Sequence, residues 1–266
     1  MNDALDAQIE NAARTLTAAS HTVALTGAGL SVESGIPPFR GKGGLWTKHG
    51  EPPMDGFQRF LRDPRKAWQD RLSPRESWAK ALHDTLARAK PNPGHRSLAE
   101  LERLGCCECV ITQNIDDLHH QAGTQSLLEI HGNHRLLRCL DCNTRFEPKE
   151  VVVDPENLPP KCPRCDGLIK GDTVQFGEPI PPDVLRGCFE QVARADCMLV
   201  AGTSATVYPA AEFPFEVLNR GGVVVEINPE PTELTGRATL SLVGPGGPVL
   251  ERVVHHVSAL LKRAAS

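Results

Sequence analysis

The chain has 266 residues, of which 40% are hydrophobic and 23% are charged, and its formal net charge is −4 at pH 7. These values are typical of a globular protein with a sizeable core and argue against a dedicated nucleic-acid-binding surface. No apolar run approaches the roughly 18 residues that span a bilayer, and the N-terminus lacks the features of a secretory signal. We expect a cytoplasmic monomer that binds neither membranes nor nucleic acid.

Apolar residues in segment 4–19 recur at helical spacing, which predicts an amphipathic helix leading into a strand over 21–26. Further short apolar runs predict buried strands, and segments with helical periodicity lie between several of them. The predicted strands are 109–112, 127–130, 197–201, 223–227 and 238–243, and the predicted helices are 97–104, 183–194 and 210–219. Strands that alternate with helices favour an α/β fold with a doubly wound, mostly parallel sheet.

Two segments, 36–94 and 135–171, interrupt this alternation. The first has loops rich in proline and glycine and then a predicted helix over 76–89, whereas the second has paired cysteines and little periodicity. We interpret both as insertions that form a second, smaller lobe of one catalytic domain spanning 1–266. The larger, Rossmann-like lobe then consists approximately of residues 1–35, 95–134 and 172–266.

The nine cysteines are an odd number, which argues against a closed disulfide framework and favours a reducing compartment. Four of them form two C-x-x-C pairs, Cys139 with Cys142 and Cys162 with Cys165, with nineteen residues between the pairs. Four thiolates satisfy tetrahedral zinc and leave no open position for water, so this spacing predicts a structural zinc site. The alternatives are incidental motifs or a redox pair, although a redox pair normally opens a helix after a strand.

Glycines and polar residues follow four of the predicted strands, at the point where each strand ends. These turns span 26–29, 112–116, 202–204 and 228–230. In a doubly wound sheet, ligands bind beyond the carboxyl ends of the strands. Each turn alone could be a helix cap, because Asn, Ser, Thr and Asp cap helices routinely. Four such turns on one sheet edge favour a ligand site.

The first turn, Gly27-Ala28-Gly29, allows the backbone to approach a phosphate closely at the start of a helix. The usual dinucleotide fingerprint would have a third glycine at position 32, where Val32 stands, and an acid near 47–50 after a second strand. These departures argue against a hydride-transferring dehydrogenase. The alternative is a plain strand-to-helix turn.

His131 directly follows the predicted strand 127–130. A neutral imidazole at a strand end can act as a general base near pH 7. A hydrogen-bonded structural histidine is the alternative. The sequence has no G-x-S-x-G elbow, H-E-x-x-H motif or Walker lysine, which argues against the common hydrolases and kinases.

Together these motifs resemble the sirtuins, the NAD-dependent protein-lysine deacylases, of the single-domain type found in bacteria and archaea. The resemblance extends from about residue 10 to residue 260. The matching segments are GAGLSVESGIPPFRG (27–41), KPNPGH (90–95), TQNIDD (112–117), EIHGN (129–133), the two cysteine pairs, FGE (176–178), GTSATVYPAA (202–211), EINPEPT (226–232) and GPGG (244–247).

The resemblance implies a smaller lobe made of a helical insertion and a four-cysteine zinc ribbon, with NAD and an acyl-lysine peptide bound between the lobes. The residues implied to bind NAD are Gly27, Ala28, Gly29, Glu33, Phe39, Arg40, Trp46, Gln113, Asn114, Ile115, Asp116, Gly202, Thr203, Ser204, Asn228, Pro229, Glu230 and Gly246. The residues implied to flank and clamp the peptide are Val174, Phe176, Gly177 and Glu178. His131 and Asn114 would act in catalysis.

The implied reaction consumes NAD as a co-substrate and transfers no hydride. The acyl oxygen attacks the anomeric carbon of the nicotinamide ribose, nicotinamide leaves, and His131 helps the ribose 2′-hydroxyl attack the resulting imidate. The products are free lysine and 2′-O-acyl-ADP-ribose. The alternatives are ADP-ribosyl transfer to a protein, which His131 disfavours, and a non-catalytic NAD sensor, which the presence of Asn114, Asp116 and His131 disfavours.

Several positions depart from the family pattern. Pro38 stands where many members have Asp or Thr, and residues 170–172 read Lys-Gly-Asp where Arg-Pro-Asp is common, a change from which we expect little effect. Members that remove acidic acyl groups such as succinyl have a Tyr and, three residues later, an Arg in the helical insertion. Counting back from Pro91 without gaps places Ala79 and Leu82 at these positions, which predicts neutral acyl groups such as acetyl or longer chains.

Overall fold

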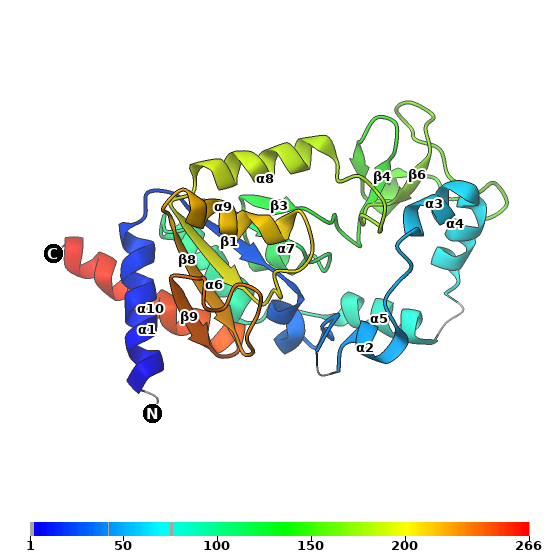
Figure 1. Cartoon of the computed structure of the whole chain (residues 1–266). Helices are drawn as coiled ribbons and strands as arrows, with labels where there is room; N and C mark the ends of the chain where they lie inside the picture. The colour runs from blue at the N-terminus through cyan, green and yellow to red at the C-terminus, as the bar shows by residue number, and fades with distance from the viewer. Residues whose placement is uncertain (1–2, 42, 75–76, 266) are drawn as a thin grey trace.

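The computed structural model describes residues 3–41, 43–74 and 77–265. The strands of its large sheet are β1 (Thr22–Thr26), β2 (Cys109–Thr112), β3 (Leu127–Glu129), β7 (Cys197–Ala201), β8 (Val223–Asn228) and β9 (Leu240–Val243). All six are parallel, in the order β3-β2-β1-β7-β8-β9 (Figure 1). The chain order reverses between β1 and β7, and ligands bind such sheets at this reversal, beyond the carboxyl ends of the strands.

The central strands are buried on both faces, which is why they read as continuous apolar runs rather than alternating ones. In β1, the side chains of Val23 and Leu25 pack on one face of the sheet and that of Ala24 packs on the other. The predicted doubly wound α/β sheet is thus confirmed.

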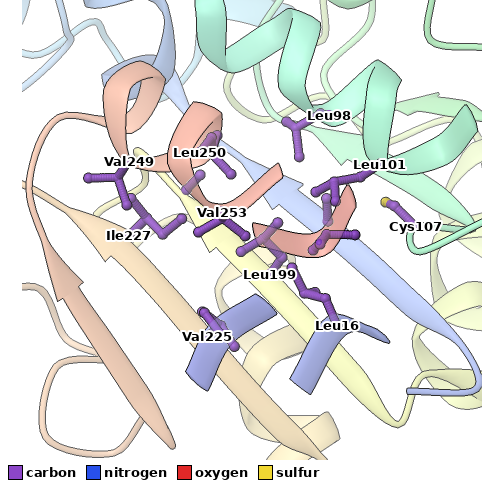
Figure 2. Packing of buried hydrophobic residues seen from close by; sticks show 14 of the residues in the cluster. Leu16, Leu98, Leu101, Cys107, Leu199, Val225, Ile227, Val249, Leu250 and Val253 are labelled. Atoms are coloured by element: carbon purple, nitrogen blue, oxygen red, sulfur yellow. The ribbon is translucent and has the colours of Figure 1, made fainter. Parts of the chain in front are cut away.

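Helices cover both faces of this sheet. They are α1 (Asp3–Ala18), α6 (Pro93–Arg103) and α10 (Gly246–Ala265) on one face, and α8 (Pro182–Arg194) and α9 (Phe213–Asn219) on the other. Figure 2 shows Leu16 of α1, Leu101 of α6 and Val253 of α10 packed around Leu199 of the sheet. No helix of the described chain is both long enough and apolar enough to cross a membrane.

Most predicted elements match the structure within one or two residues. Helix α6 instead begins at residue 93, four residues before the predicted start at 97, because Asn92 caps it. The other differences are local. Strand β9 begins at residue 240 rather than 238, and the predicted helix over 210–219 is a 3-10 turn, η3 (Ala210–Glu212), followed by α9. Pro214 in the first turn of α9 has no N–H, so the regular helix begins where that loss costs no hydrogen bond. The predicted helix over 76–89 corresponds to α5 (Ser77–Arg88). Residue 76 lies outside the described residues.

The two insertions lie together to one side of the large sheet (Figure 1). The first contains α2 (Leu45–His49), α3 (Gly56–Arg62), α4 (Pro64–Leu72) and α5. The second contains a small antiparallel sheet in the order β5-β4-β6 and a 3-10 turn. Its elements are β4 (Leu137–Cys139), β5 (Arg145–Phe146), η2 (Pro148–Glu150) and β6 (Ile169–Gly171). Phe60 of α3 and Trp68 of α4 pack in one core with Leu137 and Ile169, and Trp68 Nε1 donates to the Ile169 carbonyl at 2.8 Å. Helices α3 and α4 are therefore bound to the ribbon.

Candidate active site

The glycine turn after β1 is in direct contact with the turn after β7. The Gly29 amide donates to the Gly202 carbonyl at 2.7 Å, and a Cβ on Gly27 or Gly29 would lie 2.8 Å from that same oxygen. Gly202 has φ +65°, and a Cβ there would lie 2.2 Å from the Leu30 nitrogen. These glycines are required because two backbone turns meet at the sheet reversal, a contact that the sequence alone did not reveal.

The segment after this turn is the seven-residue 3-10 helix η1 (Ala28–Ser34) rather than the α-helix of the usual fingerprint. It ends at Gly35, which adopts the left-handed conformation at φ +85°. Val32, at the position of the missing third glycine, is 45% exposed. Since no strand packs closely there, the position needs no glycine.

A buried hydrogen-bond network joins η1 to the turn after β2. The Ser31 hydroxyl donates to Asp116 Oδ2 at 2.6 Å, and Asn114 Nδ2 donates to Ser31 Oγ at 3.1 Å and to the Gly27 carbonyl at 3.0 Å. Burial raises the pKa of Asp116. The structure thus fixes two predicted site residues, Asn114 and Asp116, through Ser31, which the sequence analysis did not identify. Its place four residues after Gly27 was the available signal.

His131 lies two residues beyond β3, and its ring is fixed by the backbone of the neighbouring turn. Its Nδ1 lies 3.1 Å from the Gln113 carbonyl oxygen. Because a carbonyl can only accept, Nδ1 carries the proton and Nε2 presents a free lone pair. Burial lowers the pKa of His131, so the ring is neutral near pH 7. Both features suit a general base.

Three aromatic rings lie close together: one from the loop after η1, one from α2 and one from the segment after β6. The ring centroids of Phe39 and Trp46 are 5.1 Å apart, and those of Trp46 and Phe176 are 5.8 Å apart. The Arg40 guanidinium lies 4.7 Å from the Trp46 ring centroid, and its Nη1 donates to Thr206 Oγ1 at 2.7 Å. The structure therefore brings the predicted NAD loop into contact with the predicted peptide segment.

Thr203 connects the turns after β2, β7 and β8. Its hydroxyl accepts from Gln113 Nε2 at 2.9 Å, and its carbonyl accepts from Asn228 Nδ2 at 3.0 Å. Of the neighbouring predicted residues, Ser204, Pro229 and Glu230 are exposed.

Two further predicted NAD residues have defined partners. The Glu33 carboxylate accepts from the Gly247 amide at 3.0 Å, next to Gly246. The Ile115 carbonyl accepts from the His134 amide at 2.9 Å. Ala28 lies half-buried at the start of η1.

The predicted peptide segment runs beside His131 and is fixed from both sides. The Val174 amide donates to the His131 carbonyl at 2.9 Å, and the Phe176 carbonyl accepts from the Phe57 amide at 3.1 Å. Gly177 adopts φ +78°. The Glu178 carboxylate accepts from Lys170 Nζ at 3.0 Å and from the Gln175 amide at 2.8 Å, so its side chain holds the segment itself rather than projecting toward a peptide.

The four paired cysteines form one cluster. Cys139 Sγ lies 3.5 Å from Cys165 Sγ, Cys142 Sγ lies 3.7 Å from Cys162 Sγ, and all four sulfur atoms lie within 4.8 Å of one another. Tetrahedral zinc with bonds of about 2.3 Å places its sulfur ligands about 3.8 Å apart. The cluster therefore fits a structural zinc ion that has no open coordination position.

A buried group of charges joins the ribbon to the loop of His131. Asp172 is completely buried and accepts from Arg138 Nε at 2.6 Å, from Arg145 Nε at 3.2 Å and from the Asn133 amide at 2.8 Å. Asn133 lies two residues after His131. The sequence analysis did not identify this group, because its members are far apart in the chain.

Comparison with known proteins identifies the family. The model described as the Sir2 family matches residues 27–209. The chain belongs to the Sir2 family. The NAD-dependent protein deacylase 1 of Archaeoglobus fulgidus is 44% identical over 95% of this Sir2 chain and 99% of its own length, and the NAD-dependent protein deacylase of Pyrococcus abyssi is 44% identical over 96% and 100%.

Solved structures of the family resemble this Sir2 protein over almost its full length. A Sir2 homolog–NAD complex is 44% identical, with a TM-score of 0.79, and the match covers 95% of this chain and 94% of the other. A Sir2–p53 peptide–NAD+ complex is 35% identical, with a TM-score of 0.74, over 92% and 97% of the two chains. The resemblance to sirtuins that the motifs indicated is thereby confirmed.

Proposed function

We propose that this Sir2-family protein is an NAD-dependent protein-lysine deacylase. The observation that carries the proposal is the geometry of His131, whose Nδ1 faces the Gln113 carbonyl at 3.1 Å and whose lowered pKa keeps the ring neutral. A base with its Nε2 free is what attack by a ribose hydroxyl requires. The names of the archaeal relatives and the ligands NAD and peptide in related structures support the same activity.

The chain's own residues have separable tasks in this proposal. Gly27 and Gly29 leave the turn after β1 free of side chains, so a pyrophosphate can approach its backbone. Asn114 and Asp116, held by Ser31, orient the nicotinamide ribose and carboxamide. Phe39 covers the position that nicotinamide leaves.

His131 acts on the sugar after the glycosidic bond has broken. When NAD and acyl-lysine are bound, the acyl oxygen displaces nicotinamide from the anomeric carbon. His131 Nε2 then takes a proton through the ribose hydroxyls, so that the 2′-oxygen can attack the acyl carbon. The carbonyl of Gln113 stabilises the protonated imidazole that results.

The two lobes have distinct roles in this proposal. The larger lobe (residues 1–35, 95–134 and 172–266) binds NAD, and the smaller lobe (36–94 and 135–171) holds the peptide against it. The shared core of Phe60, Trp68, Leu137 and Ile169 supports this division, because it joins the two insertions into one unit. The zinc ion stabilises the ribbon and takes no part in the chemistry.

Mass spectrometry of a reaction with NAD and an acetyl-lysine peptide tests the proposal. We expect one nicotinamide released for each lysine deacylated. His131→Ala should lose at least about 100-fold in deacylation rate, because general-base catalysis contributes 10²–10⁴. His83→Gln, at a side chain that is 71% exposed, is the matched control and should retain the parent rate. Nicotinamide release without peptide, with ADP-ribose attached to protein, would contradict the proposal.

A further inference from the structure

Two buried histidine rings lie against each other next to the carboxyl end of β1. His95 belongs to the first turn of α6 and is 0% exposed, and His119 belongs to α7 (Leu118–Ala122) and is 2% exposed. Their ring centroids are 4.9 Å apart, and the rings meet edge to face. Within the described part of the chain, each ring has one nitrogen without a hydrogen-bond partner, Nε2 of His95 and Nδ1 of His119.

The backbone fixes the tautomer of His95. The Asn92 amide donates to His95 Nδ1 at 3.3 Å, in the capping box of α6. Because an amide N–H can only donate, Nδ1 carries no proton. Burial lowers the pKa of His95 to about 4, so the ring is neutral at pH 7 and its one proton is on Nε2. The unpartnered nitrogen of His95 is therefore a donor.

A pair of threonine hydroxyls fixes the tautomer of His119. The Thr26 hydroxyl donates to Thr112 Oγ1 at 2.9 Å, and His119 Nε2 lies 3.0 Å from the same Thr26 oxygen. Since a hydroxyl has one proton, Thr26 must accept from Nε2. Burial lowers the pKa of His119 well below its usual value, so the ring is neutral and Nδ1 carries no proton. The unpartnered nitrogen of His119 is therefore an acceptor.

The two unpartnered nitrogens are complementary, a donor on His95 and an acceptor on His119. Rings in contact can pair such atoms directly or through one water, and leaving both unpaired inside the protein is costly. Every hydrogen bond then points in the same direction, from the Asn92 amide through both rings to Thr26 and Thr112. We call this series of bonds the histidine chain.

One end of the histidine chain is the turn that carries the proposed catalytic groups. The Asn114 amide donates to Thr112 Oγ1 at 3.1 Å, and the Gln113 amide donates to the Thr26 carbonyl at 2.9 Å. The Gln113 carbonyl in turn lies 3.1 Å from His131 Nδ1. The two threonines therefore hold the backbone that orients Asn114 and His131.

The other end of the histidine chain is connected to η1. Asn92 Nδ2 donates to the Leu30 carbonyl at 2.7 Å and to Ser34 Oγ at 3.1 Å, and both acceptors belong to η1. Asn92 Oδ1 accepts from the Gly94 amide at 2.8 Å and so caps α6. The histidine chain thus connects two segments that are proposed to bind NAD, the helix after the glycine turn and the turn after β2.

We propose that His95 and His119 are positioning residues for the deacylase reaction, because the histidine chain fixes the turn 112–114 and with it the orientation of Asn114 and His131. This inference rests on the proposed deacylase function. The two rings act through the threonines rather than on the substrate.

Histidine NMR of the parent protein without substrates tests the direction of the chain. Long-range ¹H–¹⁵N correlations distinguish the two neutral tautomers, and single variants assign each ring by its missing signal. We expect the Nε2–H form for both His95 and His119, opposite to the Nδ1–H form of His131. An Nδ1–H tautomer or a charged ring at pH 7 for His95 or His119 would overturn the inference.

Two substitutions at His119 test its effect on the reaction. His119→Phe keeps an aromatic ring but has no donor for Thr26, so kcat with an acetyl-lysine peptide should fall about tenfold or more, since small displacements of catalytic groups are costly. His119→Gln retains an N–H donor near the position of Nε2 and should stay within about threefold of the parent. Calorimetric NAD affinity should change less than about threefold in both, because a lost positioning contact lowers kcat more than ground-state binding.

Two substitutions at His95 separate its place in the α6 cap from its place in the histidine chain. His95→Asn can still accept from the Asn92 amide through Oδ1, but it has no donor at the position of Nε2. His95→Gln has that donor and lacks the acceptor at the position of Nδ1. We expect kcat to fall in His95→Asn and to be largely retained in His95→Gln. The reverse order would show that the cap, and not the histidine chain, determines activity.

His255→Phe is the matched control. His255 is exposed and forms a similar edge-to-face pair with His256 on α10, with ring centroids 6.1 Å apart, so this variant should keep the parent kcat. If the parent deacylates the peptide and His119→Phe is as fast, or His119→Gln is as slow as His119→Phe, the inference is wrong and the proposed function stands. If the parent deacylates no peptide, both fail. If His119→Phe does not fold, the tautomers in the parent and the two His95 variants decide.

Discussion

Arg138 Nε donates to Asp172 Oδ1 at 2.6 Å, with the two side chains only 4% and 0% exposed. Arg138 precedes the first zinc-ligand candidate, Cys139, whereas Asp172 also accepts from the amide of Asn133 in the loop of His131. A single buried carboxylate thus joins the ribbon to the loop that carries the proposed base. Separating this pair would leave two charges buried without partners, which is costly in free energy.

Asp172→Asn should destabilise the protein strongly. It leaves Arg138, whose side chain is 4% exposed, without a counter-charge, and breaking a buried pair typically costs about 3–5 kcal/mol. Urea unfolding measures the change. Asp84→Asn is the control, because its partner Lys80 is exposed and such surface pairs contribute less than about 1 kcal/mol. Equal effects of the two substitutions would show that Asp172 is not a central contact.

Gly202→Ala should cost more stability than Gly236→Ala. Both glycines have positive φ, +65° and +84°, so alanine strains the backbone in each by about 1–3 kcal/mol. Only at Gly202 does the new Cβ also collide with the chain, 2.2 Å from the Leu30 nitrogen, whereas nothing lies within 4 Å at Gly236. Thermal unfolding should show a larger loss of stability in Gly202→Ala than in Gly236→Ala. Calorimetry should show a loss of NAD affinity in Gly202→Ala alone. An NAD affinity unchanged in Gly202→Ala would argue that the contact between the two turns does not shape the NAD site.

Stability should fall as the pH drops below about 6.5, because His95 is buried in its neutral form. Burial lowers its pKa from 6.5 to about 4. Above pH 6.5 the ring is neutral in both states and contributes nothing. Below pH 6.5, the unfolded chain takes up a proton that the folded chain does not. The free energy of unfolding therefore falls by about 2 kcal/mol between pH 7 and pH 5.

Urea midpoints across this pH range check the sign and size of the effect. His95→Asn should flatten the slope, whereas His255→Asn, at an exposed position, should leave it as in the parent. A slope that survives in His95→Asn would assign the effect to other groups, among them His119, whose pKa burial also lowers.

Removing zinc should disrupt the smaller lobe rather than only slow the reaction. The ribbon strands β4 and β6 share a core with α3 and α4, and without a metal the four thiols have no bond to close their turns. Hydrogen exchange after chelation should show loss of protection in 56–72 and 137–171, with recovery when zinc is added back. Protection unchanged by chelation would show that the ribbon folds without metal.

The strands of the large sheet were predictable because burial on both faces demands continuous apolar residues. Cys109–Thr112 and Cys197–Ala201 are strands with the predicted bounds. Helix α10 was not predicted, although Val249, Leu250, Val253 and Val257 face the core at helical spacing. The glycines and proline at its start suggest a loop, and packing against α1 and α6 overrides that local preference.

The parts of the site made of consecutive residues were predictable from the sequence. The parts made of residue pairs far apart in the chain were not. Turns such as Gly27–Gly29 and 113–116 each contain several polar or small residues at one strand end. Ser31 and Asp116 are 85 residues apart, and Arg138 and Asp172 are 34 apart, so neither bond has a local signal. The contact with Gly202, which explains the first glycine turn, is likewise visible only in three dimensions.

The centroid of the Trp46 ring lies 5.1 Å from that of Phe39 and 5.8 Å from that of Phe176. One ring therefore touches both the loop assigned to NAD and the segment assigned to the peptide. If either substrate shifts this ring, the two binding equilibria are linked, and linkage is reciprocal: whatever factor the peptide adds to the affinity for NAD, NAD adds to the affinity for the peptide. The indole is also a natural fluorophore at the point where the two events meet, so the order in which the substrates bind can be followed from its emission.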